Sequence, residues 1–224
     1  MYTCAGYLSS EMNGWIAIPG TDGYAHCFGG TDWTVSDANE FLVAPTLLLN
    51  LDLSDPKLAH LKNEKLETLP ICSYINCDLW IETQYFQIKS ELAEVVIVRR
   101  SSRYTTIFEG SLRYPNPLPR RSISLRPMTD SEMAVSDADY GRAADSFVGG
   151  QSFIRICGPP LWLQNPEASV CTCGNEQSYV CSIGYEVPDA IGLLDDRPFF
   201  IGEAALYFFL CGECLILSVI SQST

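Results

Sequence analysis

The segment 204–220, AALYFFLCGECLILSVI, constrains the fold of this chain more than any other part of its sequence. It is largely apolar, is interrupted near its middle by Gly212 and Glu213, and is rich in aromatic and β-branched side chains. A membrane-spanning helix needs about 20 consecutive apolar residues, whereas aromatic and β-branched residues favour strands. The segment therefore predicts two buried strands joined by a turn, not a membrane span.

Four cysteines near the C-terminus form two short pairs, Cys171 with Cys173 and Cys211 with Cys214. The second pair encloses the predicted turn. Gly174 follows the first pair, and Gly212 lies between the two members of the second. Zinc is held tetrahedrally by four thiolates at about 2.3 Å, and short cysteine pairs at two turns supply such a cage. We therefore predict a structural Zn²⁺ site. Four cysteine ligands leave no position for a catalytic water.

Three other interpretations of these cysteines stay open on sequence grounds. The first pair has one intervening residue, so both thiols reach one ion only at a tight turn, and Cys157 or Cys181 could replace a member. The thiols could also be buried core residues, because free cysteine packs as a small apolar side chain. A redox dithiol at Cys211 and Cys214 is the third, but no strand-then-helix pattern of thioredoxin type follows them.

Composition argues against catalysis and against general nucleic-acid binding. The 224 residues carry 14 Lys and Arg against 27 Asp and Glu, a net charge of −13, whereas phosphate binding needs a basic surface. The two histidines are His26 and His60. His26 adjoins Cys27, but adjacent side chains point apart, and His60 fits a packing or surface position. Because phosphate-loop, Gly-rich, hydrolase and metalloprotease motifs are also missing, we predict no catalytic residue.

Periodicity and turn residues predict an α+β fold with a largely antiparallel sheet, a few helices and a C-terminal zinc-ribbon-like hairpin pair. Asp55 and Pro56 are typical of a helix start, with Asp55 as the N-cap. The other expected elements are a helix over 55–67, strands within 69–89 and 94–100, and a helical or linker segment within 127–150. We expect an N-terminal part, 1–146, and a Cys-rich β unit, 147–224, packed as one body.

The segment 99–126 is basic inside an acidic protein, with seven arginines against one acidic residue, Glu109. Three prolines exclude a helix through its centre and favour extended chain. The arginines either pair with the acidic remainder of the protein or form a strip that binds an anionic ligand. We favour pairing.

The C-terminal third contains a series of motifs, from FVGGQSFIRICGPPLWLQNPEASVCTCG at 147–174 to RPFFIGEAALYFFLCGEC at 197–214. These segments resemble the YwqG-like family of bacterial proteins, a family of unknown function. The chain departs from the family pattern in a wider gap before the tryptophan and in its Cys-x-Cys spacing. The resemblance implies an α+β, largely antiparallel fold, and some members look like neighbours of bacterial toxin genes. The matching positions are Gly149, Gly150, Pro160, Trp162, Gln164, Cys173, Gly174, Tyr207, Phe209, Cys211 and Cys214.

Charge and resemblance together predict a cytoplasmic, non-enzymatic protein that binds a basic protein partner. The most direct such role is immunity to a basic bacterial toxin such as a nuclease, because an acidic surface attracts a basic partner and speeds association. Tryptophans are common interface anchors, and the candidates are Trp15, Trp33, Trp80 and Trp162, of which Trp162 fits core packing best. The alternative is a structural or regulatory zinc-ribbon protein that binds a nucleic acid or another anion through the 99–126 strip.

Overall fold

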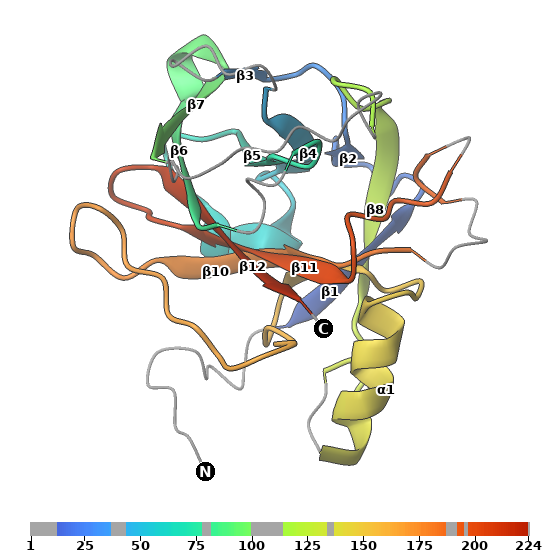
Figure 1. Ribbon diagram of the computed structural model, residues 1–224. Coiled ribbons are helices and arrows are strands. Elements are labelled where there is room, and N and C mark those ends of the chain that lie inside the picture. Colours follow the sequence, from blue (N-terminus) through green and yellow to red (C-terminus); the bar gives the residue numbers. More distant parts are fainter. Residues whose placement is uncertain are drawn as a thin grey trace.

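The computed structural model describes residues 13–36, 44–77, 82–99, 114–133, 137–186, 192–194 and 197–223. In these residues twelve strands form one sheet that curves into a nearly closed barrel (Figure 1). The strands follow the order β3-β7-β6-β12-β11-β10-β9-β1-β8-β2-β4-β5. Their bounds are β1 (Gly14–Pro19), β2 (Cys27–Phe28), β3 (Thr34–Ser36), β4 (Thr46–Asp52), β5 (Thr68–Ser73), β6 (Gln84–Lys89), β7 (Glu94–Arg99), β8 (Arg121–Pro127), β9 (Ile154–Cys157), β10 (Ser178–Ile183), β11 (Ala204–Leu210) and β12 (Ile216–Ser223).

Neighbouring strands are antiparallel except β3 and β7, which are parallel. Sequence-distant parts share the sheet, since β1 pairs with β9 and β12 pairs with β6. A side chain links the end of β5 to β6: Gln84 Oε1 on β6 accepts hydrogen bonds from the Tyr74 amide (3.1 Å) and the Ser73 hydroxyl (3.2 Å).

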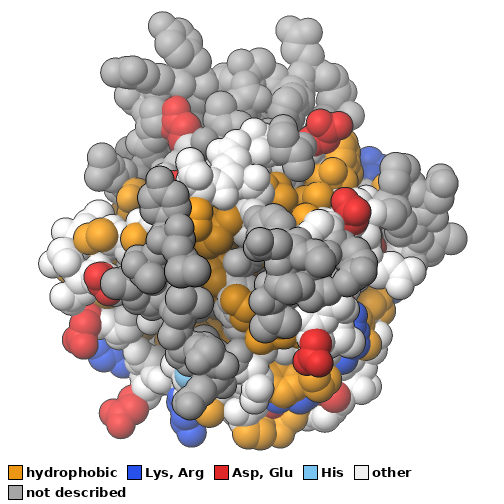
Figure 2. All heavy atoms as spheres, turned by 90° about the horizontal axis from the view of Figure 1, so that it is seen from below, with side chains coloured by type: hydrophobic (Ala, Val, Ile, Leu, Met, Phe, Trp, Pro, Cys, Tyr) orange, Lys and Arg blue, Asp and Glu red, His pale blue; other side chains and the backbone are white. Residues whose placement is uncertain are grey.

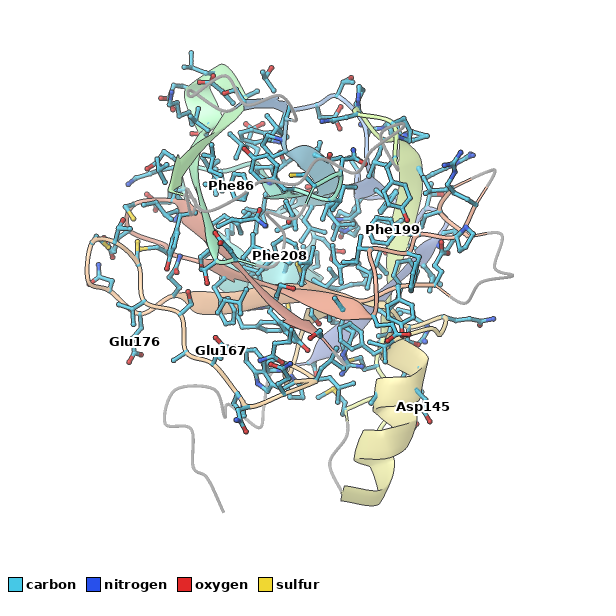
Figure 3. All side chains as sticks on the ribbon, in the orientation of Figure 1. Phe86, Asp145, Glu167, Glu176, Phe199 and Phe208 are labelled. Atoms are coloured by element: carbon cyan, nitrogen blue, oxygen red, sulfur yellow. The ribbon has the colours of Figure 1, made fainter. Side chains whose placement is uncertain are left out.

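The predicted strand–turn–strand at 204–220 is confirmed as β11 and β12, with Leu210 opposite Leu217 next to the turn. The run is apolar without alternation because β11 is buried on both faces. Leu206, Phe208 and Leu210 face the core inside the barrel. The alternate side chains of β11 belong to a second cluster outside it, and Figure 3 shows Phe86, Phe199 and Phe208 within the barrel.

The outer cluster is covered by the helix α1 (Asp137–Phe147) and by a loop that carries Trp162. The Trp162 ring stacks on Tyr207 with centroids 4.5 Å apart, and the Tyr207 hydroxyl donates to the carbonyl of Leu161 at 2.8 Å. Burying an aromatic side chain of this kind adds about 1.5–3 kcal/mol to the free energy of unfolding. The expectation that Trp162 is a core residue is therefore correct, and α1 lies within the predicted 127–150 segment.

The predicted helix over 55–67 is wrong in length and type. The structure has a 3-10 helix, η1 (Pro56–Leu61), and a second, η3, at Ser90–Leu92. Asp55 does cap η1, since its carboxylate accepts from the Lys57 amide at 2.9 Å. Burial of Leu58 and Leu61 anchors the short helix, and the chain then turns back through a bridge between Asn63 and Leu66.

Other strand predictions are confirmed in β5, β6 and β7, which lie within 69–89 and 94–100 apart from one residue at the start of β5. The expected α+β class is not confirmed, because the described residues are mostly strand and contain one α-helix. The zinc-ribbon-like unit is likewise not confirmed, since its hairpin is part of the barrel sheet. No helix among the described residues is both long and apolar enough to cross a membrane.

Candidate metal centre

Four predicted ligands, Cys171, Cys173, Cys211 and Cys214, converge at one end of the β11–β12 hairpin. Their Sγ atoms all lie within 4.8 Å of one another. The sulfurs of Cys171 and Cys214 are 3.2 Å apart, those of Cys173 and Cys211 3.7 Å, and those of Cys173 and Cys214 3.8 Å. All four are free thiols, because a disulfide bond is about 2.05 Å long.

The distances between sulfurs fit a tetrahedral metal ion. A zinc–sulfur bond of about 2.3 Å places the sulfurs of a regular tetrahedron about 3.8 Å apart. Of the three separations given above, the two longer ones match this spacing, and the shortest, between Cys171 and Cys214, would need to open by about 0.6 Å. The four cysteines therefore form a cluster suited to a metal ion.

The turn of the first pair brings two closely spaced thiols to the same side. The Cys171 amide donates to the Asn175 carbonyl at 2.8 Å, and the Gly174 amide donates to the Cys171 carbonyl at 2.9 Å. Gly174 has φ +89°, a conformation that glycine adopts without strain. This tight turn resolves the sequence-level difficulty that a Cys-x-Cys pair presents for one ion.

The second turn is fixed by residues from distant strands and loops. The Cys211 amide donates to Ile216 and the Leu215 amide donates back to Cys211, both at 2.9 Å. From β6, the Gln87 side chain donates to the Cys214 carbonyl at 2.7 Å, and Asn63 donates to the Gly212 carbonyl at 2.9 Å. The thiol cage is therefore held in place by the barrel wall.

Thiol ionisation in the cluster is uneven. Burial raises the pKa of Cys171, but hydrogen bonds from the Cys173 amide and the Cys214 thiol outweigh it and lower that pKa to about 7. Burial raises the pKa of Cys214, and the neighbouring thiols of Cys171 and Cys211 raise it further. Cys173 is exposed, so the cage opens to solvent on one side. Of these two thiols, Cys171 therefore ionises at the lower pH.

The alternative ligands Cys157 and Cys181 lie elsewhere. Both are buried in the core inside the barrel, on β9 and β10, and burial raises the pKa of each thiol. They are core thiols of the kind that sequence alone also allowed.

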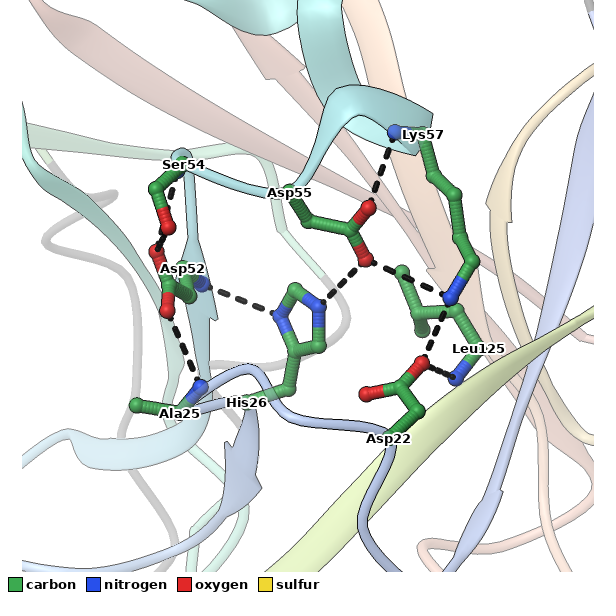
Figure 4. Close-up of polar contacts among 8 residues, drawn as sticks. All are labelled: Asp22, Ala25, His26, Asp52, Ser54, Asp55, Lys57 and Leu125. Atoms are coloured by element: carbon green, nitrogen blue, oxygen red, sulfur yellow. Dashed lines mark hydrogen bonds and ion pairs between the residues drawn. The ribbon is translucent and has the colours of Figure 1, made fainter.

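His26 and Cys27 are not brought together as a nucleophile and base. His26 is buried, its Nε2 donates to Asp55 Oδ2 at 3.0 Å, and its Nδ1 accepts from the Asp52 amide at 3.0 Å (Figure 4). Cys27 contacts Asp32 instead, with Sγ to Oδ2 3.6 Å. The histidine therefore holds the β4–η1 corner, a structural contact that the sequence did not reveal because Asp55 is 29 residues away.

The arginines of the 99–126 segment that the structure describes are mostly engaged. Arg120 forms an ion pair with Asp32, and Arg126 binds both carboxylate oxygens of Glu132, with Nη2 to Oε1 2.6 Å. The pairing interpretation is correct for these two. Arg100, Arg103 and Arg113, the tryptophan Trp80, and the Arg99 side chain lie outside the described residues.

An acidic cavity of about 610 Å³ lies between the β2, β4 and η3 regions, and sequence reasoning missed it. Its wall includes the ring of Trp33, whose indole donates to Asn50 and Thr68 at 3.1 Å each. The charged residues that line it are Asp32, Glu64, Lys65, Glu67, Glu91 and Arg120.

Comparison with protein-family models, with curated proteins and with solved structures finds no match to this chain. The resemblance to the YwqG-like family therefore stays a prediction. The class that the fold and site define is a mostly β, barrel-like protein with a cluster of four cysteines.

Proposed function

We propose that Cys171, Cys173, Cys211 and Cys214 hold one structural zinc ion. The sulfur separations near 3.8 Å support this assignment, as does the docking of the 211–214 turn on the barrel through Gln87 and Asn63. Thiolate ligands favour zinc over hard cations such as Mg²⁺ or Ca²⁺. The ion would link the turn at 171–174 to the β11–β12 hairpin and leave no coordination position for substrate.

We further propose that the protein acts by binding a basic protein partner, as an immunity protein against a basic bacterial toxin such as a nuclease. The observation that carries this proposal is the acidic cavity. Asp32 and Arg120 neutralise each other there, and Lys65 points to the Glu213 carbonyl, with Nζ to oxygen 3.5 Å. The remaining carboxylates, of Glu64, Glu67 and Glu91, are exposed. They would receive a lysine or arginine side chain of the partner.

The rest of the surface supports association with a cation-rich partner. The chain has a net charge of −13, and Figure 2 shows acidic side chains spread singly over one face. Such a charge distribution accelerates the encounter with a basic protein. This acceleration becomes smaller as salt is added, because interactions between exposed charges are screened beyond about 8–10 Å. Nucleases are suited to this field, since they carry basic surfaces for phosphate binding.

Binding of the full-length protein to a panel of purified basic nuclease toxin domains, by biolayer interferometry at two salt concentrations, tests the proposal. We expect one or more domains to bind with an association rate that falls as salt rises. The double variant Glu64→Lys, Glu67→Lys should lower that rate about tenfold or more.

The matched control is Asp145→Lys with Glu176→Lys, which changes the net charge equally at sites distant from the cavity (Figure 3). This control should retain most of the association rate. An equal loss in both double variants would contradict the cavity as the docking site, and failure of every basic domain to bind would contradict the role.

A further inference from the structure

The cysteine cluster is accessible to solvent at one of its two turns more than at the other sulfurs. Cys173 is exposed and Cys214 is half-buried. The other two members, Cys171 and Cys211, are only 3% and 1% exposed. A small oxidant such as hydrogen peroxide therefore reaches the cluster first at Cys173, because access controls the oxidation of a thiol together with its ionisation.

Short sulfur contacts join one turn of the cluster to the other. Cys171 Sγ of the first turn lies 3.2 Å from Cys214 Sγ of the second, across 43 positions of the chain. Cys173 Sγ lies 3.7 Å from Cys211 Sγ, across 38 positions. These two contacts use each of the four sulfurs once. The fold therefore places the sulfurs for two disulfides between the turns.

We propose that the four cysteines are a peroxide-sensitive modification site. Oxidation joins Cys171 to Cys214 in one disulfide. It joins Cys173 to Cys211 in a second, and the metal ion is released. The inference rests on the proposed zinc site for the release of the ion, whereas the disulfides need only the four sulfurs and a peroxide.

Each disulfide forms in two steps that consume one peroxide. The Cys173 thiolate attacks an oxygen of hydrogen peroxide, so that the O–O bond breaks, a sulfenic acid forms and hydroxide leaves. The Cys211 thiolate then attacks the Cys173 sulfur, so that the S–S bond forms, the S–O bond breaks and a second hydroxide leaves. Two thiolates are oxidised to one disulfide, and both hydroxides take up protons to give water. A second peroxide oxidises Cys171 and Cys214 in the same way.

The oxidised cluster loses the metal but keeps the two turns linked. Thiolates are the ligands of a four-cysteine zinc site, and none of the four remains once both disulfides have formed. The disulfides join the 171–174 turn to the β11–β12 hairpin, the same two segments that the ion would join. The hydrogen bonds from Gln87 and Asn63 to the second turn go to main-chain carbonyls and do not involve sulfur. We therefore expect the barrel to stay folded after oxidation.

Treatment of the full-length protein with hydrogen peroxide tests this site. Peptide mass spectrometry without reduction maps the disulfides, and a chromophoric chelator follows zinc release. We expect both disulfides between the turns, release of about one zinc per chain, and return of the four thiols after dithiothreitol. Cys157 on β9 and Cys181 on β10 have 0% exposure, so both should stay reduced.

Two controls show whether the fold directs the pairing. Cys214→Ser should lose the disulfide at Cys171 and keep the one between Cys173 and Cys211, whereas Cys181→Ser should form both. If Cys214→Ser does not fold, wild-type protein oxidised in urea replaces it. In the unfolded chain the entropic cost of closing a loop falls with loop length, so the disulfide within the 211–214 turn should replace the disulfides between the turns.

The proposal is overturned if the folded protein keeps its four thiols in peroxide, if it forms a disulfide between Cys211 and Cys214, or if folded and urea-treated protein give the same pairing. Zinc-loaded protein whose thiols resist peroxide would overturn the modification site and leave the zinc site standing. Protein that lacks zinc and still forms both disulfides would contradict the zinc site and support the pairing.

Discussion

The Sγ atoms of Cys171 and Cys214 lie 3.2 Å apart although the two residues are separated by 43 positions in the chain. Neither residue belongs to a strand, and each is delivered by a tight turn that the barrel wall supports through β10, β11 and β12. The contact between these two sulfurs therefore depends on the correct pairing of three neighbouring strands. It makes the thiol cluster a sensitive probe of the native fold.

Protein purified without chelator or added metal should contain about one zinc per chain. Cys211→Ala and Cys214→Ala should lose the metal and unfold at a lower temperature, because three thiolates and water bind zinc more weakly than four thiolates. Metal analysis and thermal unfolding measure both effects. Cys181→Ala, a core thiol, should lose stability but keep the zinc; wild-type protein that folds without metal would argue against the site.

Glu132 should make stability dependent on acid pH. Hydrogen bonds from Arg126 lower its folded-state pKa far below the ordinary 4.5, despite burial that raises it. The folded state thus favours the ionised form of Glu132. The stabilisation that the ionised carboxylate gives the folded protein is therefore present above pH 4.5 and is lost as the pH falls below it. Glu132→Gln should cost about 1–3 kcal/mol at pH 7.

Chemical denaturation of the wild-type protein and of Glu132→Gln between pH 7 and pH 2 tests this direction of pH dependence. The difference in the free energy of unfolding should shrink steadily below pH 4.5. Asp145→Asn, on an exposed position of α1, should show no such trend. A difference that grows as the pH falls would be inconsistent with the ion pair.

Gln84 should be important for closing the barrel. Its Oε1 accepts hydrogen bonds from the buried Tyr74 amide and Ser73 hydroxyl, so its loss removes two buried hydrogen bonds. Gln84→Met keeps the side-chain volume and should destabilise the protein by about 1–3 kcal/mol. Hydrogen exchange should show faster opening of β5 and β6 than of the β11–β12 hairpin, whereas uniform acceleration would place the closure elsewhere.

Cys27 should resist alkylation in the folded protein. Burial raises the pKa of its thiol to about 11, so the reactive thiolate is scarce at neutral pH. Iodoacetamide labelling followed by peptide mass spectrometry should find Cys27 unmodified at pH 7.5. In metal-free protein the exposed Cys173 should be labelled first, and rapid labelling of Cys27 would reopen the nucleophile interpretation.

Local chemistry explains which elements the sequence predicted correctly. The β11–β12 turn was predictable because Gly212 and Glu213 interrupt a largely apolar run, and Asp55 before Pro56 is a local capping signal. The grouping of the four cysteines was also predictable, since short cysteine pairs at two turns are typical of metal sites. The predicted helix over 55–67 failed because burial of Leu58 and Leu61 anchors a short 3-10 helix, an effect of tertiary contacts.

The sequence by itself determined the strand-rich character, the cysteine pairs and the acidic charge, because each depends on residue type and near-neighbour spacing. Only the tertiary structure decided that the strands form one barrel-like sheet and that His26 pairs with Asp55. It alone buried the Arg155 side chain with Nε and Nη1 lacking a hydrogen-bond partner among the described residues. These relationships depend on strand order and burial, which bring together residues whose sequence separation carries no periodic or local signal.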